Sequence, residues 1–157
     1  VAFGAVAQNV ARIAAGLGMT VAAFSPTGHP EKIKAAGFEA YESLDKLFQE
    51  CDIVSLHIPS NPQTQKSIGY DLVSKMKKKA ILVNSARKEV IDEEGLIKAM
   101  CEREDLRYVS DLMTKPSKSW EVAMCSLLRK WEHKQRKPIS TLAWLLHVKS
   151  LPSLRTV

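Results

Sequence analysis

The chain has 157 residues, which is enough for one domain with a sizeable hydrophobic core and short for two. Its net charge of +6 is concentrated at one end: residues 114–157 hold nine Lys and Arg against two Glu, while the preceding 113 residues sum to −1. A protein that binds nucleic acid through its main domain would carry excess positive charge there. The distribution therefore disfavours nucleic acid as a partner of the main domain.

The other compositional signals indicate the cytoplasm. The three cysteines, Cys51, Cys101 and Cys125, are an odd number without the spacing of a zinc or redox motif, so we expect unpaired thiols in a reducing compartment and no metal site. The sequence shows no targeting signal and no apolar run of membrane-spanning length. We therefore expect a cytoplasmic protein that does not contact a membrane.

Residues 1–113 alternate between helix-like and strand-like segments. The helix-like segments repeat apolar residues at helical spacing, whereas the strand-like segments are short apolar runs. Such alternation predicts a parallel sheet with helices on both faces, a Rossmann-like doubly wound α/β fold whose ligand site lies beyond the carboxyl ends of the strands. In chain order, the predicted helices span 6–17, 29–37, 43–51, 70–76 and 92–103, and the predicted strands span 19–24, 52–58, 79–86 and 107–113.

The first segment resembles a dinucleotide-binding turn that lacks its preceding strand. Ala2, Gly4 and Ala7 have the spacing of G-x-G-x-x-G/A, in which small residues let the backbone approach a pyrophosphate at a helix N-terminus. A small-residue turn before a helix can also serve packing alone. About twenty residues further on, where an acid usually binds the adenosine ribose, the chain has Ser25. We expect the first strand of the sheet to be missing.

Polar residues follow the later strands. His57 and Pro59 end one predicted strand, and the position of His57 taken by itself favours a residue that only caps the strand end. Arg87 follows the next predicted strand, where its two parallel donors suit a carboxylate. The alternative for Arg87 is a surface ion pair with an acid such as Glu89.

Three segments in this order resemble the cofactor domain of the D-isomer-specific 2-hydroxyacid dehydrogenases. They are "GLGMTVAAFSP", "CDIVSLHIPSNPQTQKSIG" and "ILVNSARKEVIDEEGL", and within the family they are most similar to phosphoglycerate dehydrogenases. The resemblance runs from residue 1 to about residue 112. Lys88 departs from it, because the family usually has a glycine after the arginine.

The resemblance implies an NAD-dependent oxidoreductase acting on the CH–OH group of a small 2-hydroxy acid, with 3-phosphoglycerate as the expected substrate and a homodimer as the expected assembly. Arg87 matches the family's catalytic arginine, which binds the substrate carboxylate. The family's substrate domain is absent from these residues, so we expect this chain to be inactive alone. The positions that match the family's cofactor-binding segments are Gly4, Ala5, Val6, Ser25, Pro26, His57, Ile58, Pro59, Thr64, Asn84, Ser85, Ala86 and Asp111.

Residues 114–157 do not resemble the family and form an atypical basic tail. If residues 131–147, "WEHKQRKPISTLAWLLH", were translated one nucleotide out of register, the neighbouring frame permits "GAQTAEANINAGLAAA", preceded by Met, which resembles the family's next helix. We therefore hypothesise that this tail is out of frame. The alternative is an evolved basic extension with two amphipathic helices, over 118–130 and 139–149.

Two other functions stay open beside the dehydrogenase. Ser25 and Ala2 favour a nucleotide-binding module without catalysis, because both replace residues usual at a dinucleotide site. The basic, tryptophan-bearing tail could instead bind nucleic acid or another partner, and that binding would be sensitive to salt.

Overall fold

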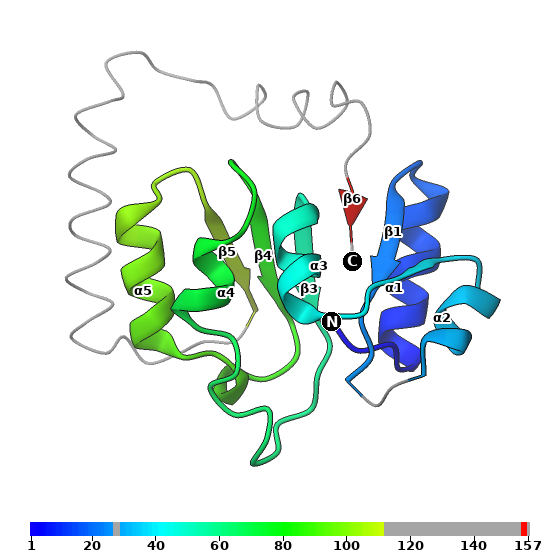
Figure 1. Ribbon diagram of the computed structural model, residues 1–157, viewed down its shortest axis with the longest axis horizontal. Helices are drawn as coiled ribbons and strands as arrows, with labels where there is room; N and C mark the ends of the chain where they lie inside the picture. The colour runs from blue at the N-terminus through cyan, green and yellow to red at the C-terminus, as the bar shows by residue number, and fades with distance from the viewer. Residues whose placement is uncertain (27–28, 112–154, 157) are drawn as a thin grey trace.

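The computed structural model describes residues 1–26, 29–111 and 155–156, and these residues form one parallel sheet with helices on both faces (Figure 1). The strand order is β2-β1-β6-β3-β4-β5, and every neighbouring pair is parallel. This is the doubly wound α/β fold that the sequence predicts. The elements are α1 (Ala5–Gly16), β1 (Thr20–Ala23), α2 (Pro30–Ala35), β2 (Glu39–Ala40), α3 (Leu44–Glu50), β3 (Ile53–Leu56), α4 (Tyr70–Ser74), β4 (Ile81–Asn84), the 3-10 helix η1 (Lys88–Val90), α5 (Glu93–Glu102), β5 (Arg107–Ser110) and β6 (Arg155–Thr156).

Local sequence signals explain several element boundaries. Ser43 caps α3, because its hydroxyl accepts a hydrogen bond from the Lys46 backbone N–H at 3.2 Å. Gly37 follows α2 with φ +85°, a left-handed conformation that glycine adopts without steric cost. The two-residue strand β2 was not predicted, since Glu39–Ala40 is too short to show a periodicity.

The two ends of the chain share the central position of the sheet, between β1 and β3. Val1 lies in the part of this position that is next to the carboxyl end of β3. The Val1 ammonium donates to the Ser55 carbonyl oxygen at 2.6 Å, and the Val1 carbonyl accepts from the His57 N–H at 3.0 Å. Strand β6 occupies the amino end, where Thr156 pairs with both Val21 and Ile53. From the sequence we expect this position to lack its strand, and the contribution of β6 was not predicted.

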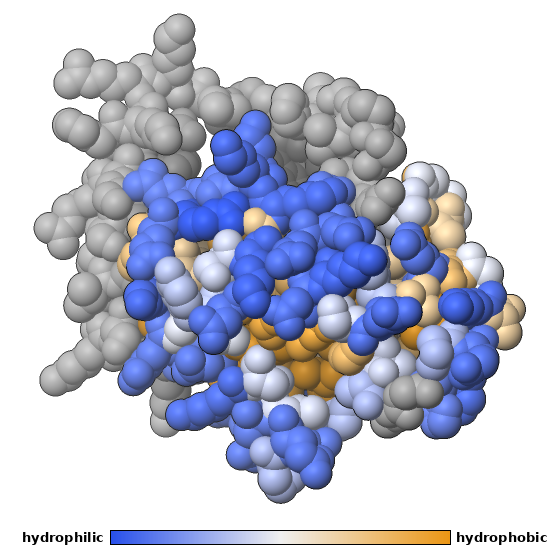
Figure 2. Space-filling model, in the orientation of Figure 1, coloured by the Kyte–Doolittle hydropathy of each residue, from blue (hydrophilic) through white to orange (hydrophobic). Residues whose placement is uncertain are grey.

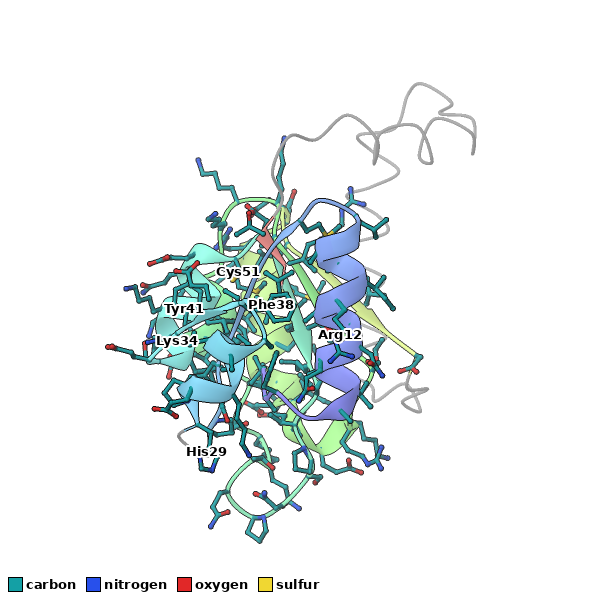
Figure 3. All side chains as sticks on the ribbon, turned by 90° about the vertical axis from the view of Figure 1, so that its right-hand side faces the viewer. Arg12, His29, Lys34, Phe38, Tyr41 and Cys51 are labelled. Carbon is teal, nitrogen blue, oxygen red and sulfur yellow. The ribbon has the colours of Figure 1, made fainter. Side chains whose placement is uncertain are left out.

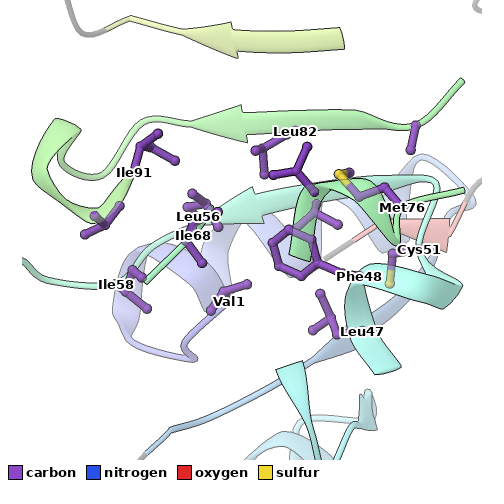
Figure 4. Close-up of a cluster of buried hydrophobic side chains, with 14 of the residues drawn as sticks. Val1, Leu47, Phe48, Cys51, Leu56, Ile58, Ile68, Met76, Leu82 and Ile91 are labelled. Atoms are coloured by element: carbon purple, nitrogen blue, oxygen red, sulfur yellow. The ribbon is translucent and has the colours of Figure 1, made fainter. Parts of the chain in front are cut away.

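The main hydrophobic core lies between the sheet and the helices α3, α4 and α5. Phe48 and Leu47 of α3 are fully buried, and Figure 4 shows Phe48 lying between Leu47 and the strand that carries Leu82. A smaller cluster of Ala11, Ala14 and Val21 packs α1 against β1, on the other side of the sheet. Figure 3 shows α1 on one side of the sheet and α2 and α3 on the other.

Hydrophilic residues cover most of the face of the molecule formed by α3, α4 and α5 (Figure 2). Hydrophobic residues show between them and near α1, where Val6, Ile13 and Leu17 are 65–73% exposed. None of the described helices has the length and apolar character needed to cross a membrane.

The predicted tail falls almost wholly outside the described residues. The proposed shift of reading frame and the alternative helices over 118–130 and 139–149 concern residues that are not described. Only Arg155–Thr156, in β6, belongs to the described part of this tail.

Candidate functional site

A cleft of about 590 Å³ opens at the carboxyl ends of β1 and β3. The turn before α1, the segment after β1 and the loop after β3 meet there. In a doubly wound sheet this is the position at which ligands bind, because the loops diverge on either side of the central strand. The described residues that line the cleft are Ala2, Phe3, Gly4, Ser25, Pro26, His29, Lys32, His57, Ile58, Pro59, Asn61, Gln63 and Thr64.

The turn before α1 is held by the sheet and leads directly into the helix. The Ala2 N–H donates to the Phe24 carbonyl at 2.8 Å, and Ala2 has φ 70°, a conformation that glycine adopts more readily than alanine. Gly4 is the N-cap of α1, and no described side chain caps this end. The first N–H groups of α1 have no partner within the helix, so they can bind an anion in the cleft.

Gly4 shows that the turn leaves room for a ligand. A Cβ atom added to Gly4 would meet no protein atom within 4 Å, and its φ of −76° is accessible to any residue. Neither packing nor backbone conformation therefore requires glycine at this position. A side chain there would project into open space beside the helix N-terminus, where the pyrophosphate of a dinucleotide binds in this class of fold.

The loop after β3 is fixed by its own side chains. Asn61 and Thr64 bond reciprocally: the Asn61 N–H donates to Thr64 Oγ1 and the Thr64 N–H donates to Asn61 Oδ1, both at 2.9 Å. The Thr64 hydroxyl also donates to the Pro59 carbonyl at 2.6 Å. The loop thus presents a preformed wall to the cleft.

His57 is a neutral side chain at neutral pH. Burial lowers the pKa of His57 to about 4, and the charge of the Val1 ammonium contributes in the same direction. The ring nitrogen Nε2 lies 3.0 Å from the Ser55 hydroxyl. His57 can therefore contact a cofactor as a neutral polar group, and it does not place a charge in the cleft.

Asn84, at the end of β4, is completely buried and organises the loop that carries Arg87. Its Nδ2 donates to the Arg87 carbonyl at 3.0 Å and lies 3.3 Å from the Tyr108 hydroxyl, while its Oδ1 accepts from the Ala86 N–H at 3.1 Å. Both ends of the Asn84 amide therefore form hydrogen bonds with other groups of this chain.

Arg87 and Asp111 follow neighbouring strands. Asn84 pairs with Ser110 in register, so the segments after β4 and β5 leave the sheet side by side. Arg87 is exposed, and its Nη1 donates to the Ala86 carbonyl at 2.8 Å. Among the described residues Arg87 forms no salt bridge, so the predicted alternative of an ion pair with Glu89 is not observed.

The structure gathers seven of the predicted cofactor-binding residues around the cleft and places the others elsewhere. Ala5 and Val6 lie on α1 outside the lining, and Asn84, Ser85, Ala86 and Asp111 lie at the ends of β4 and β5. The seven lining residues are Gly4, Ser25, Pro26, His57, Ile58, Pro59 and Thr64.

Five residues that line the cleft were not predicted from the sequence. Asn61 stands in a loop already singled out through Thr64, so its position could have been inferred from the turn-forming pattern "SNPQT". The positions of His29 and Lys32 depend on how α2 packs against β1 and β2, which no local pattern reveals. The remaining two are Phe3 and Gln63.

Comparison with protein families agrees with this arrangement. The family model "D-isomer specific 2-hydroxyacid dehydrogenase, NAD binding domain" matches residues 1–133. Among curated proteins, D-3-phosphoglycerate dehydrogenase 2, chloroplastic, of Arabidopsis thaliana is 43% identical over 98 residues, which are 62% of this chain and 16% of that protein. Glyoxylate reductase of Thermococcus kodakarensis is 43% identical over 102 residues, 65% of this chain and 30% of that protein.

A solved structure has the same fold. The NAD+-bound 3-phosphoglycerate dehydrogenase of Entamoeba histolytica superposes with a TM-score of 0.67 at 39% identity, covering 76% of this chain and 37% of that one. The chain spans less than a third of the length of the two curated relatives named above, from Arabidopsis and Thermococcus. The match over residues 1–133, the fold and the cleft agree: the chain belongs to the D-isomer-specific 2-hydroxyacid dehydrogenases and matches their NAD-binding domain.

Proposed function

We propose that this chain is the cofactor-binding part of an NAD-dependent dehydrogenase that oxidises the CH–OH group of a 2-hydroxy acid, with 3-phosphoglycerate as the substrate. The observation that carries this proposal is the open space beside Gly4 at the N-terminus of α1, in the same cleft as the strand-end residues Ser25 and His57. NAD supplies the hydride acceptor in such a reaction. The named relative from Arabidopsis and the solved structure from Entamoeba support 3-phosphoglycerate.

Each part of the cleft has a role in this proposal. The N–H groups of α1 bind the pyrophosphate, the loop from Pro59 to Thr64 encloses the cofactor, and neutral His57 provides a polar contact without charge. Arg87, outside the cleft, binds the substrate carboxylate through two parallel donors and stabilises charge that develops on the reacting oxygen.

We further propose that the chain binds NAD but does not turn over substrate alone. Dehydrogenation needs a substrate surface facing the cofactor, and the chain spans only 16% and 30% of its two named relatives. Among the described residues Cys51 and Cys101 are not in a disulfide, which supports a reducing compartment such as the cytoplasm, and the exposed apolar side chains of α1 support a homodimer.

Glyoxylate, a 2-oxo acid that would be reduced in the reverse direction of this reaction, is the second candidate substrate. The relative from Thermococcus kodakarensis named glyoxylate reductase is as similar in sequence as the phosphoglycerate dehydrogenase. Both candidates carry the carboxylate that Arg87 would bind, so Arg87 does not distinguish them.

A calorimetric titration with NAD+ tests the proposal on the chain as it exists. Gly4→Val should keep the fold, because the new side chain meets no protein atom near its Cβ, and should abolish NAD+ binding by entering the space of the pyrophosphate. Gly16→Val is the matched control, since Gly16 lies at the other end of α1 and also has open space around it. Equal NAD+ affinity in both variants would contradict the assignment of this cleft.

A further inference from the structure

Among the described residues, the end of the cleft next to β1 is lined by no acidic side chain. In dinucleotide-binding sheets an Asp or Glu after the second strand accepts hydrogen bonds from the adenosine ribose hydroxyls and repels a phosphate at the 2′ position. In this chain the strand in that position is β1, which follows α1. It ends at Ala23, and the segment from Ser25 to Pro30 contains neither Asp nor Glu. The group that normally excludes a 2′-phosphate is therefore missing.

Two basic side chains line the cleft at this end. His29 precedes α2 and Lys32 lies within it, and both line the cleft together with Ser25. Figure 3 shows His29 below α2, at the end of the sheet where the loops gather. Glu31 stands between them in sequence but does not line the cleft, and none of the described lining residues is a carboxylate.

We infer that Ser25, His29 and Lys32 form a subsite for a phosphate on the 2′ position of the adenosine ribose, so that the chain binds NADP more tightly than NAD at low ionic strength. The inference rests on the proposed function and narrows its cofactor. A phosphate at this place receives hydrogen bonds from the serine hydroxyl and the imidazole, and it is attracted by the Lys32 ammonium. Because Lys32 is exposed, salt weakens the preference.

Calorimetric titration of the intact chain with adenosine 2′,5′-bisphosphate and with 5′-AMP isolates this subsite, because the two probes differ only in the 2′-phosphate. We expect the bisphosphate to bind about fivefold more tightly at low salt, the upper range for one exposed charge pair. NADP+ and NAD+ should show the same order, and added salt should reduce the difference.

Three variants assign the effect to named residues. Lys32→Ala should remove most of the preference, and Ser25→Asp should lower bisphosphate affinity about tenfold by placing like charges together. Lys78→Ala is the control: it removes the same charge from the segment before β4, at the amino end of the strands, and should leave both affinities unchanged.

Equal affinity for the two probes would overturn the inference and leave the proposed NAD+ site intact. The same conclusion follows if Lys32→Ala and Lys78→Ala change the affinity ratio equally. If neither probe nor NAD+ binds, the inference and the proposed function both fail.

Discussion

The side chain of Asn84 holds the backbone of Arg87: Nδ2 of the completely buried amide donates to the Arg87 carbonyl oxygen over 3.0 Å. The oxygen of the same amide, Oδ1, accepts a hydrogen bond from the Ala86 N–H. One buried side chain therefore determines the path of the loop that carries the proposed catalytic arginine.

Asn84→Ala should destabilise the protein by about 2 kcal/mol, because it leaves the Ala86 N–H and the Arg87 carbonyl without their partners. Urea unfolding followed by circular dichroism measures the loss. Ser85→Ala is the control, since Ser85 is exposed and the change should stay within about 0.5 kcal/mol. Equal stability of the two variants would contradict a structural role for the Asn84 amide.

Arg87→Ala, made in a full-length enzyme that carries this domain, should lower kcat/KM by roughly 10²–10³-fold, as expected when a donor to the developing charge is lost. NAD affinity should not change, because Arg87 does not line the cleft. Steady-state kinetics and cofactor titration measure the two effects separately. Lys88→Ala is the control, because it removes a neighbouring exposed charge and should leave turnover unchanged. If Arg87→Ala keeps its turnover, the assignment of Arg87 as the catalytic arginine is wrong.

Protein stability should fall as the pH decreases from about 6.5 to about 4. The pKa of His57 is about 4 in the folded chain and about 6.5 in the unfolded chain, so the unfolded state binds more protons in this window and acid favours it. Urea midpoints across this range should become less pH-dependent in His57→Gln, and an unchanged dependence below pH 6.5 would contradict the lowered pKa.

Ala2→Gly should stabilise the chain by about 0.5–1 kcal/mol, because Ala2 has a positive φ of 70° that glycine adopts without steric cost. The same substitution three residues later gives the control. Ala5→Gly lies in α1, where glycine should destabilise by about 1 kcal/mol. Thermal melting of the two variants should therefore shift in opposite directions, and a lower melting temperature for Ala2→Gly would show that Ala2 is not strained.

Gly95→Ala should be strongly destabilising although Gly95 lies in a helix. Its added Cβ would come within 2.6 Å of the Tyr70 backbone N and of Asp92 Oδ2, so α5 and the start of α4 would have to separate. We expect a loss of about 2 kcal/mol from this overpacking. Gly16→Ala, in open space in α1, should instead stabilise by about 0.5–1 kcal/mol. Equal chemical-denaturation midpoints would show that the two helices can move apart without cost.

Much of the fold could be predicted because its signals are local. The Ser43 cap, the left-handed Gly37 and the apolar run before Asn84 each depend on residues within one or two turns of the chain. Strand β2 could not be predicted in the same way, because its two residues are defined only by pairing with β1.

Sequence alone determined the alternation of strands and helices, and with it the edge of the sheet where Gly4, Ser25 and His57 meet, because residues that follow parallel strands emerge at the same edge. Tertiary structure alone decided that His29 and Lys32 line that cleft together with His57, and that Val1 and β6 share the central position of the sheet. These relationships join residues through packing and strand pairing across long stretches of chain. Hydrophobic periodicity and turn preferences reach only a few residues, so they cannot specify which distant side chains come together.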